Sequence, residues 1–183
     1  LNEKALDGTP TIYFACCAGN IESIDLFIKK GFDFGEVLKN GMYPFLAVME
    51  NGHHDAALYI LLNKPRIKNI NQCTETGITP LHWAIYYGWS DVVKQLISYG
   101  ASVTSSVKSN GMNAIHLACL HDQPKCLSSL ITSPNAYYGL SDSGVNPLHV
   151  AVIHSAQCAH LLIEKNLVDT KTKDPNGYTS RDI

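Results

Sequence analysis

The chain has 183 residues, with 14 Lys and Arg against 16 Asp and Glu, so its formal net charge is −2 and only 16% of its residues are charged. This near-neutral balance argues against a nucleic-acid-binding domain, which normally carries a basic face. No apolar run approaches the roughly 20 residues that span a bilayer. We therefore expect no nucleic-acid partner and no membrane insertion.

The chain begins Leu1-Asn2-Glu3-Lys4, without an initiator Met or the apolar stretch of a signal peptide, and we expect it to be a piece of a longer protein. Its six cysteines show no C-x-x-C spacing and are too sparse for a disulfide scaffold. They predict free thiols in a reducing compartment, cytoplasmic or nuclear. Four fall at expected core positions of helices: Cys16, Cys119, Cys126 and Cys158.

Glycines recur along the chain with a period near 33, at positions 8, 41, 77, 111, 144 and 177. A fixed period of this length is the signature of a repeat protein, in which each unit buries its apolar face only by stacking on its neighbours. The units are approximately residues 5–37, 38–73, 74–107, 108–140 and 141–173, followed by a partial unit at 174–183. We expect further repeats or a capping helix beyond both ends.

The third unit shows how each repeat is expected to fold. Thr79 can cap a first helix, and Pro80 occupies its first position, where the missing N–H costs nothing. Gly88 separates this helix from a second one, which Gly100 ends in a left-handed conformation. Pro147 repeats the place of Pro80 in the fifth unit. Each unit is therefore predicted to be a pair of helices.

These segments resemble the ankyrin repeat, whose signature is T-P-L-H-x-A. The resemblance rests on Gly77-Ile78-Thr79-Pro80-Leu81-His82-Trp83-Ala84, Gly111-Met112-Asn113-Ala114-Ile115-His116-Leu117-Ala118 and Gly144-Val145-Asn146-Pro147-Leu148-His149-Val150-Ala151. It implies an all-α solenoid of stacked helix-turn-helix units with β-hairpin finger loops, forming one domain over residues 1–183. It also implies a structural role for His82, His116 and His149, whose imidazoles tie adjacent fingers together.

No pattern in the chain predicts catalysis, and we expect neither an enzyme nor a bound cofactor. The nucleotide-binding, serine-hydrolase and zinc-protease motifs are all absent. His121 and His154 share a register in consecutive units. Equivalent positions of stacked helices lie about 10 Å apart, which is too far for one metal ion. We expect no metal site.

Ankyrin arrays are typically protein–protein interaction modules, and the resemblance implies a concave face formed by fingers and first helices. In that family the residue after the repeat glycine projects onto this face; here these residues are mostly apolar. An alternative remains, that some of these side chains pack on the neighbouring finger. The predicted partner-binding residues are Met42, Glu50, Asn51, Ile78, Tyr86, Tyr87, Met112, Leu120, His121, Val145, Ile153 and His154.

The sequence therefore predicts a non-catalytic scaffold that binds another protein or a linear peptide. The alternative is a regulatory module of a larger enzyme or channel whose active part lies outside this chain. A weaker likeness, carried by His116–Pro124 and His149–His154, is to the inhibitors of Rel-type transcription factors.

Overall fold

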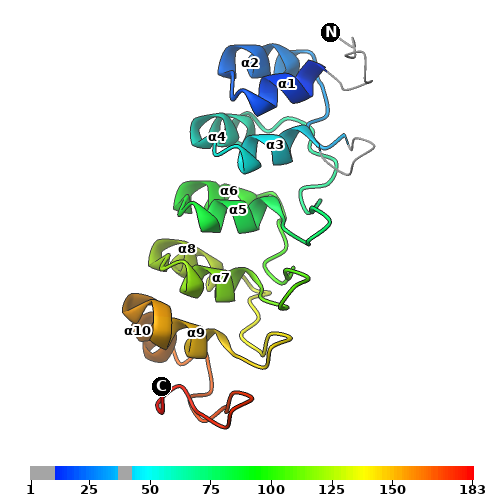
Figure 1. Cartoon of the computed structure of the whole chain (residues 1–183). Coiled ribbons are helices and arrows are strands. Elements are labelled where there is room, and N and C mark those ends of the chain that lie inside the picture. The colour runs from blue at the N-terminus through cyan, green and yellow to red at the C-terminus, as the bar shows by residue number, and fades with distance from the viewer. Residues whose placement is uncertain (1–10, 37–42) are drawn as a thin grey trace.

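The computed structural model describes residues 11–36 and 43–183, and within these ranges ten α-helices form five pairs that stack into an elongated solenoid (Figure 1). The first helix of each pair, here called the inner helix, packs on the inner helix of the next pair, and the second, outer helices do the same. The inner helices are α1 (Thr11–Cys17), α3 (Pro44–Glu50), α5 (Pro80–Tyr86), α7 (Ala114–Leu120) and α9 (Pro147–His154). The outer helices are α2 (Ile21–Lys29), α4 (His54–Asn63), α6 (Ser90–Ser98), α8 (Pro124–Leu130) and α10 (Ala156–Glu164).

The predicted start of the inner helices is confirmed in the third and fifth pairs. Thr79 Oγ1 accepts a hydrogen bond from the His82 backbone N–H, and Pro80 is the first residue of α5. Asn146 caps α9 in the same way, ahead of Pro147. These caps satisfy N–H groups that have no partner within the helix, and so they fix where each helix begins.

The turn between inner and outer helix needs a left-handed residue in most pairs. Gly88, which was predicted to separate the two helices, has φ +73°. Gly100, which follows α6, has φ +88°, the left-handed conformation predicted for it. In the fourth pair Asp122 takes the place of the glycine with φ +51°, and its carboxylate accepts a hydrogen bond from the Ser155 hydroxyl. Ser155 alone separates α9 from α10. The fifth pair therefore lacks the left-handed turn.

The three predicted structural histidines are buried but do not all behave alike. The Nε2 atom of His82 donates to the Ser105 carbonyl over 3.0 Å, and that of His116 donates to the Val145 carbonyl over 3.1 Å. Burial lowers the pKa of both imidazoles, so they stay neutral at neutral pH. The Nε2 atom of His149 is buried without a hydrogen-bond partner in the described part of the chain. The expected tie to the next finger is therefore present for His82 and His116 and absent for His149.

The all-α repeat solenoid is confirmed, and its fingers contain little β-pairing. In the described ranges, strand-like pairing is limited to two isolated antiparallel bridges, Ser106–Asn113 and Lys173–Thr179. Each finger closes a tight turn with backbone bonds of its own, such as Val107 N to Met112 O over 2.9 Å and Ser141 N to Val145 O over 2.9 Å. Neighbouring fingers are also joined, by bonds from Lys108 N to Thr76 O over 3.0 Å and from Asp142 N to Asn110 O over 3.1 Å.

The core runs the length of the stack, between inner and outer helices and between successive pairs. The four cysteines expected in the core are buried, and Cys17 and Cys73 are half-buried. Burial raises the pKa of the Cys126 thiol to about 11 and raises that of Cys16 further, so both thiols stay protonated. None of the described helices has the length and apolar character needed to cross a bilayer.

Candidate functional site

The C-terminal ends of the inner helices bring most of the predicted binding residues onto one face, here called the inner-helix face (Figure 1). Two residues from the end of each inner helix form two rows along the stack. In the first four pairs they are the last helical residue and the one that follows it, and in the fifth they are the last two residues of α9. The first row is Cys17, Glu50, Tyr86, Leu120 and Ile153, and the second is Ala18, Asn51, Tyr87, His121 and His154. These rows cross all five pairs.

An aromatic cluster of His54, Trp83, Tyr86, Tyr87, Trp89 and His121 occupies the middle of this face. The Tyr87 ring stacks on Trp89, with centroids 4.7 Å apart, and on Trp83 at 6.0 Å. Tyr86 meets Tyr87 edge-on at 5.1 Å. Such offset and edge-to-face contacts are the favoured geometries of aromatic pairs. They hold both tyrosine rings in fixed positions.

The cluster crosses the boundaries between pairs. Tyr86 meets His121 of the fourth pair edge-on at 5.1 Å, and the Tyr87 hydroxyl donates to the Glu50 carbonyl of the second pair over 3.2 Å. His54, at the start of α4, lies edge-on to Trp89 at 5.2 Å. One patch of side chains therefore spans three consecutive repeats.

Exposure differs sharply among the predicted residues. Tyr86 is 53% exposed, Tyr87 37% and Ile153 61%. Asn51 and His154 are exposed too, whereas Glu50, Leu120 and His121 are half-buried. The helical rows thus leave large apolar side chains in solvent.

The finger residues of the prediction are less accessible. Ile78, Met112 and Val145 are half-buried, and the last two pack against the hydrophobic core. Their placement agrees with the alternative that finger side chains pack within the stack. Met42 lies outside the described residues.

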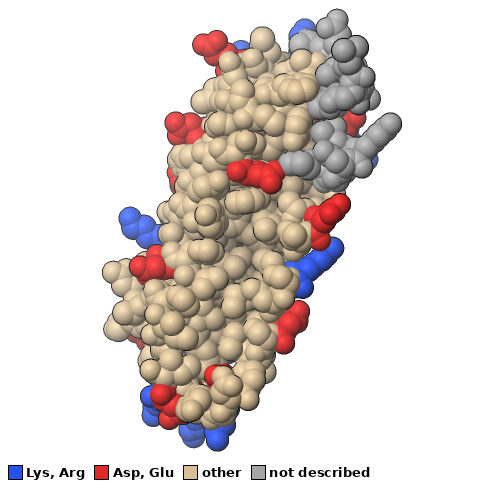
Figure 2. All heavy atoms as spheres, in the orientation of Figure 1, with Lys and Arg blue, Asp and Glu red and all other residues tan. Residues whose placement is uncertain are grey.

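The face is almost free of charge. Glu50 is the one Asp, Glu, Lys or Arg in the two rows. In Figure 2 most of the visible surface carries no charged side chain, and Lys, Arg, Asp and Glu atoms lie mainly along its margins. Burial, and then the neighbouring His154, lower the pKa of His121, so its imidazole is neutral at neutral pH. No group of three His, Cys, Asp or Glu side chains gathers into a metal-like cluster within residues 11–36 and 43–183.

Two aromatic residues of the inner helices, Trp83 and Phe14, are missing from the sequence-based prediction. Trp83 lies one turn before Tyr86 on α5 and supplies one side of the stack around Tyr87. Phe14 has the same register in the first pair and is 49% exposed. The sequence could have predicted both. Each occupies the x position of T-P-L-H-x-A, which lies on the same helix face as the residue three positions later, and that later residue was in the row already expected to face solvent.

Comparisons with known proteins agree with this architecture. The family model described as Ankyrin repeats (3 copies) matches residues 12–107 and 91–176. The mouse B-cell lymphoma 3 protein homolog is 33% identical over 137 residues, which cover 70% of this chain and 30% of that protein. Mouse Rabankyrin-5 is 28% identical over 168 residues, 91% of this chain and 14% of that protein. Tyrosine-protein kinase HTK16 of Hydra vulgaris is 25% identical over 103 residues, 56% of this chain and 14% of that protein.

The chain spans less than a third of the length of each of these relatives. The family match, by contrast, extends over nearly all of the described helices. The periodic glycines, the capped inner helices and the family match agree, and the chain belongs to the ankyrin-repeat family.

Proposed function

We propose that this chain is a non-catalytic binding module that recognises a partner protein, or an extended peptide of one, on its inner-helix face. The observation that carries the proposal is Tyr86, an aromatic residue that is 53% exposed although three ring contacts fix its position. Ankyrin repeats generally act as protein-interaction modules, and that supports the same role here.

The energetics favour a partner that covers this tyrosine. A tyrosine buries about 150–250 Å², so covering the exposed half of Tyr86 removes about 100 Å² from water and contributes roughly 2 kcal/mol. Its rotamer is already fixed in the free protein, so little side-chain entropy is lost on binding. Exposed Tyr residues of this kind are typical of the few positions that dominate binding energy.

The composition of the face indicates the class of partner. Phosphate groups are bound mainly by Lys and Arg, and the two rows contain neither. Apolar and aromatic side chains around Tyr86 and Ile153 instead suit an apolar strip of a protein. We infer a protein partner in an intracellular setting, in keeping with the six unpaired thiols.

A second role is compatible with the same binding chemistry. One relative is named as a tyrosine-protein kinase, of which this chain covers 14%. In a parent protein of that type the module would direct or regulate an activity that lies elsewhere. The inner-helix face would remain the contact surface in both cases.

The test compares charge substitutions on the two sides of the solenoid. Tyr86→Glu and Ile153→Glu introduce a charge into the inner-helix face at positions that are 53% and 61% exposed. Leu62→Glu and Ile163→Glu are matched controls on outer helices, 57% and 54% exposed. Tyr87 is a poorer probe, because its ring and hydroxyl help to hold the second and third pairs together.

Proteins recovered with the tagged chain from cell extracts are quantified for each variant, after far-UV circular dichroism has verified folding. We expect Tyr86→Glu to weaken capture of the specific partner by about 30-fold, the equivalent of roughly 2 kcal/mol. The outer-helix controls should leave capture unchanged. The proposal fails if the outer-helix variants weaken capture and the inner-helix variants do not.

A further inference from the structure

Two buried thiols from different repeats meet where the fourth pair of helices packs on the fifth. Cys119 lies near the end of the inner helix α7, and Cys158 lies in the first turn of the outer helix α10. Both side chains are fully buried, and the two helices are in contact. The Cys158 sulfur lies 3.7 Å from the backbone carbonyl oxygen of Ala118, the residue next to Cys119. The packing therefore brings together two thiols that are far apart in the sequence.

The two thiols also interact with each other. The Cys119 S–H donates a hydrogen bond to the Cys158 sulfur, and the Cys158 S–H donates in turn to the Ala118 carbonyl. The bond from Cys119 lowers the pKa of Cys158, although burial opposes this, and the same bond together with burial raises the pKa of Cys119. Cys158 is therefore the more readily ionised and more nucleophilic thiol of the two. Cys119 is the thiol placed to react with it next.

Two departures from the repeat pattern hold this junction in place. Asp122 stands where the third pair has Gly88, and its carboxylate accepts a hydrogen bond from the Ser155 hydroxyl. The Ser155 hydroxyl oxygen in turn accepts a hydrogen bond from the Cys158 backbone N–H over 3.1 Å. The first turn of α10 is thus tied to the turn that follows α7. These bonds keep Cys158 beside the end of the helix that carries Cys119.

A third cysteine provides a comparison within the same molecule. Cys126 is the third residue of α8, as Cys158 is of α10, and it is buried too. Its sulfur is near enough to Cys158 for their charges to interact, but the thiol hydrogen bond of Cys158 is with Cys119. In the third pair the same register holds the buried Val92. A cysteine at this register thus packs as a small apolar residue, and Cys158 differs from Cys126 in its thiol neighbour.

From this contact we propose that Cys119 and Cys158 form a reversible disulfide between the fourth and fifth repeats when the chain meets hydrogen peroxide. The Cys158 sulfur attacks one peroxide oxygen, the O–O bond breaks, and the other oxygen leaves as water with the thiol proton. The Cys119 sulfur then attacks the sulfur of the Cys158 sulfenic acid. The S–S bond forms, the S–O bond breaks, and a second water leaves with the Cys119 proton. The two thiols lose two electrons, which reduce the peroxide to water.

Burial limits which oxidants reach this pair and how fast. Neither sulfur is exposed, so peroxide arrives during brief local openings between the repeats, and the reaction is slow. Hydrogen peroxide is close to water in size, so it needs a smaller opening than an aromatic thiol reagent does. The disulfide closes a loop from residue 119 to residue 158, which restricts the unfolded chain and stabilises the folded one. Neither sulfur belongs to the inner-helix face, so this proposal stands or falls independently of the function proposed above.

Mass spectrometry of the full chain tests the proposal. The reduced, folded protein is treated with hydrogen peroxide, its remaining thiols are blocked with N-ethylmaleimide, and it is digested with trypsin without reduction. Trypsin places Cys119 in the peptide 109–125 and leaves Cys126 and Cys158 together in the peptide 126–165. We expect these two peptides to be linked, with fragmentation locating the bond at Cys158, and at least about tenfold more of this link than of any other cysteine pair. Dithiothreitol should reverse it.

Two alanine variants complete the test, after circular dichroism has verified folding. Cys126→Ala, the matched control, removes a buried thiol of the same register and should keep the link and the peroxide-induced rise in the midpoint of urea unfolding, roughly 1 M. Cys119→Ala should lose both. If Cys119→Ala does not fold, the linked peptides of the unmodified chain and of Cys126→Ala still decide. A link through Cys126, links only between chains, or oxidation to sulfinic acids without a link would overturn the proposal.

Discussion

The closeness of neighbouring fingers predicts that Gly111→Ala is much more destabilising than Gly100→Ala. Both glycines are left-handed, with φ of +67° and +88°. A Cβ atom on Gly100 would have no neighbour within 4 Å, whereas one on Gly111 would lie 2.5 Å from the Asp142 backbone nitrogen of the next finger. The two substitutions therefore share the backbone strain and differ in the space available.

The magnitudes follow from these two effects. Left-handed backbone costs an alanine roughly 1–2 kcal/mol, and the stiffer unfolded chain returns about 0.4–1 kcal/mol, so we expect Gly100→Ala to cost about 1 kcal/mol. At Gly111 the finger of the fifth repeat must also move, and overpacking of this kind adds about 1–3 kcal/mol. The Asp142 N to Asn110 O hydrogen bond is at risk as well. The expected difference is about 2 kcal/mol.

Urea unfolding followed by far-UV circular dichroism measures this difference, with the slope of the transition compared among the variants. For a chain of this size, 1 kcal/mol corresponds to a shift of about 2–4 °C in the midpoint of thermal unfolding. The expected difference of about 2 kcal/mol therefore makes the midpoint of Gly111→Ala roughly 4–8 °C lower than that of Gly100→Ala. Equal destabilisation by both substitutions would refute the reasoning. It would mean that the fingers separate at no cost and do not hold one another.

Two further results are expected from the titratable groups. His54 bonds to the carboxylates of Asp55 over 2.9 Å and Asp91 over 3.0 Å, and these bonds, that of Asp55 first, raise its pKa. Protonated His54 stabilises the fold fully below its ordinary pKa of about 6.5, and this stabilisation is lost as pH rises through the raised pKa of the folded state. Asp91→Asn should therefore destabilise the protein more at about pH 6 than at about pH 9. The difference between the two pH values should be less than about 1 kcal/mol, because the pair is partly exposed. Equal destabilisation at both pH values, measured by urea unfolding, would contradict this. Ellman's reagent should react quickly with only two thiols of the native protein, those of half-buried Cys17 and Cys73, and should reach the four buried thiols only after unfolding. A third fast-reacting thiol in the native protein would contradict the described packing.

Features set within a single repeat could be predicted from the sequence. The caps at Thr79 and Asn146, the left-handed Gly88 and Gly100, and the buried cysteines all follow from local patterns of residue type. Because the same pattern recurs in each unit, every copy supports the interpretation of the others. The exposure of Tyr86 belongs to this group as well.

Features that depend on the contact between two repeats could not be predicted from the sequence. The bond from the Tyr87 hydroxyl to the Glu50 carbonyl and the stacking of Trp83 on Tyr87 depend on how neighbouring helices are placed. Half-burial of Met112 and Val145 depends on how closely the fingers approach. In each case the sequence supplies the residue type, and the offset between repeats decides what it touches.

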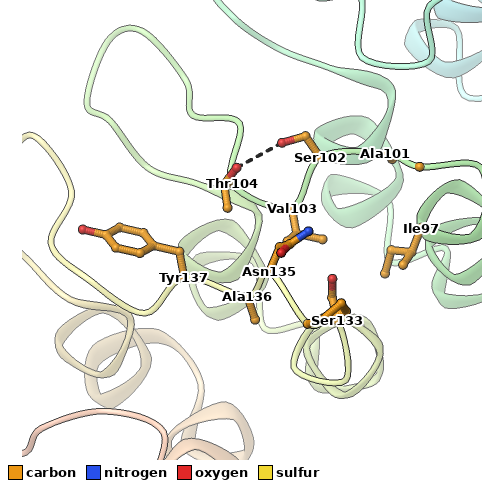
Figure 3. Close-up of a pocket in the computed structure, with 11 residues that line it drawn as sticks. Ile97, Ala101, Ser102, Val103, Thr104, Ser133, Asn135, Ala136 and Tyr137 are labelled. Atoms are coloured by element: carbon orange, nitrogen blue, oxygen red, sulfur yellow. Dashed lines mark hydrogen bonds between the residues drawn. The ribbon is translucent and has the colours of Figure 1, made fainter.

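The contact at position 71 and its counterpart at 104 show the same limit. Asn71 bonds across a repeat boundary to the Ser102 N–H and the Gly100 carbonyl, whereas Thr104, at the same register, bonds to the Ser102 hydroxyl of its own loop (Figure 3). A threonine for asparagine change looks conservative within one repeat, because both residues are small and polar. Its effect on the contact between repeats appears only in the folded stack.

The aromatic cluster also determines what spectroscopy can detect. The chain has two tryptophans, Trp83 and Trp89, and both lie in the third repeat, stacked on the same Tyr87 ring. Intrinsic fluorescence therefore reports on the centre of the array, while circular dichroism reports on helices along its whole length. An array whose terminal repeats melt first would lose ellipticity while its emission stayed native. Comparing the two signals in one titration would thus reveal the order in which the repeats unfold, without any added label.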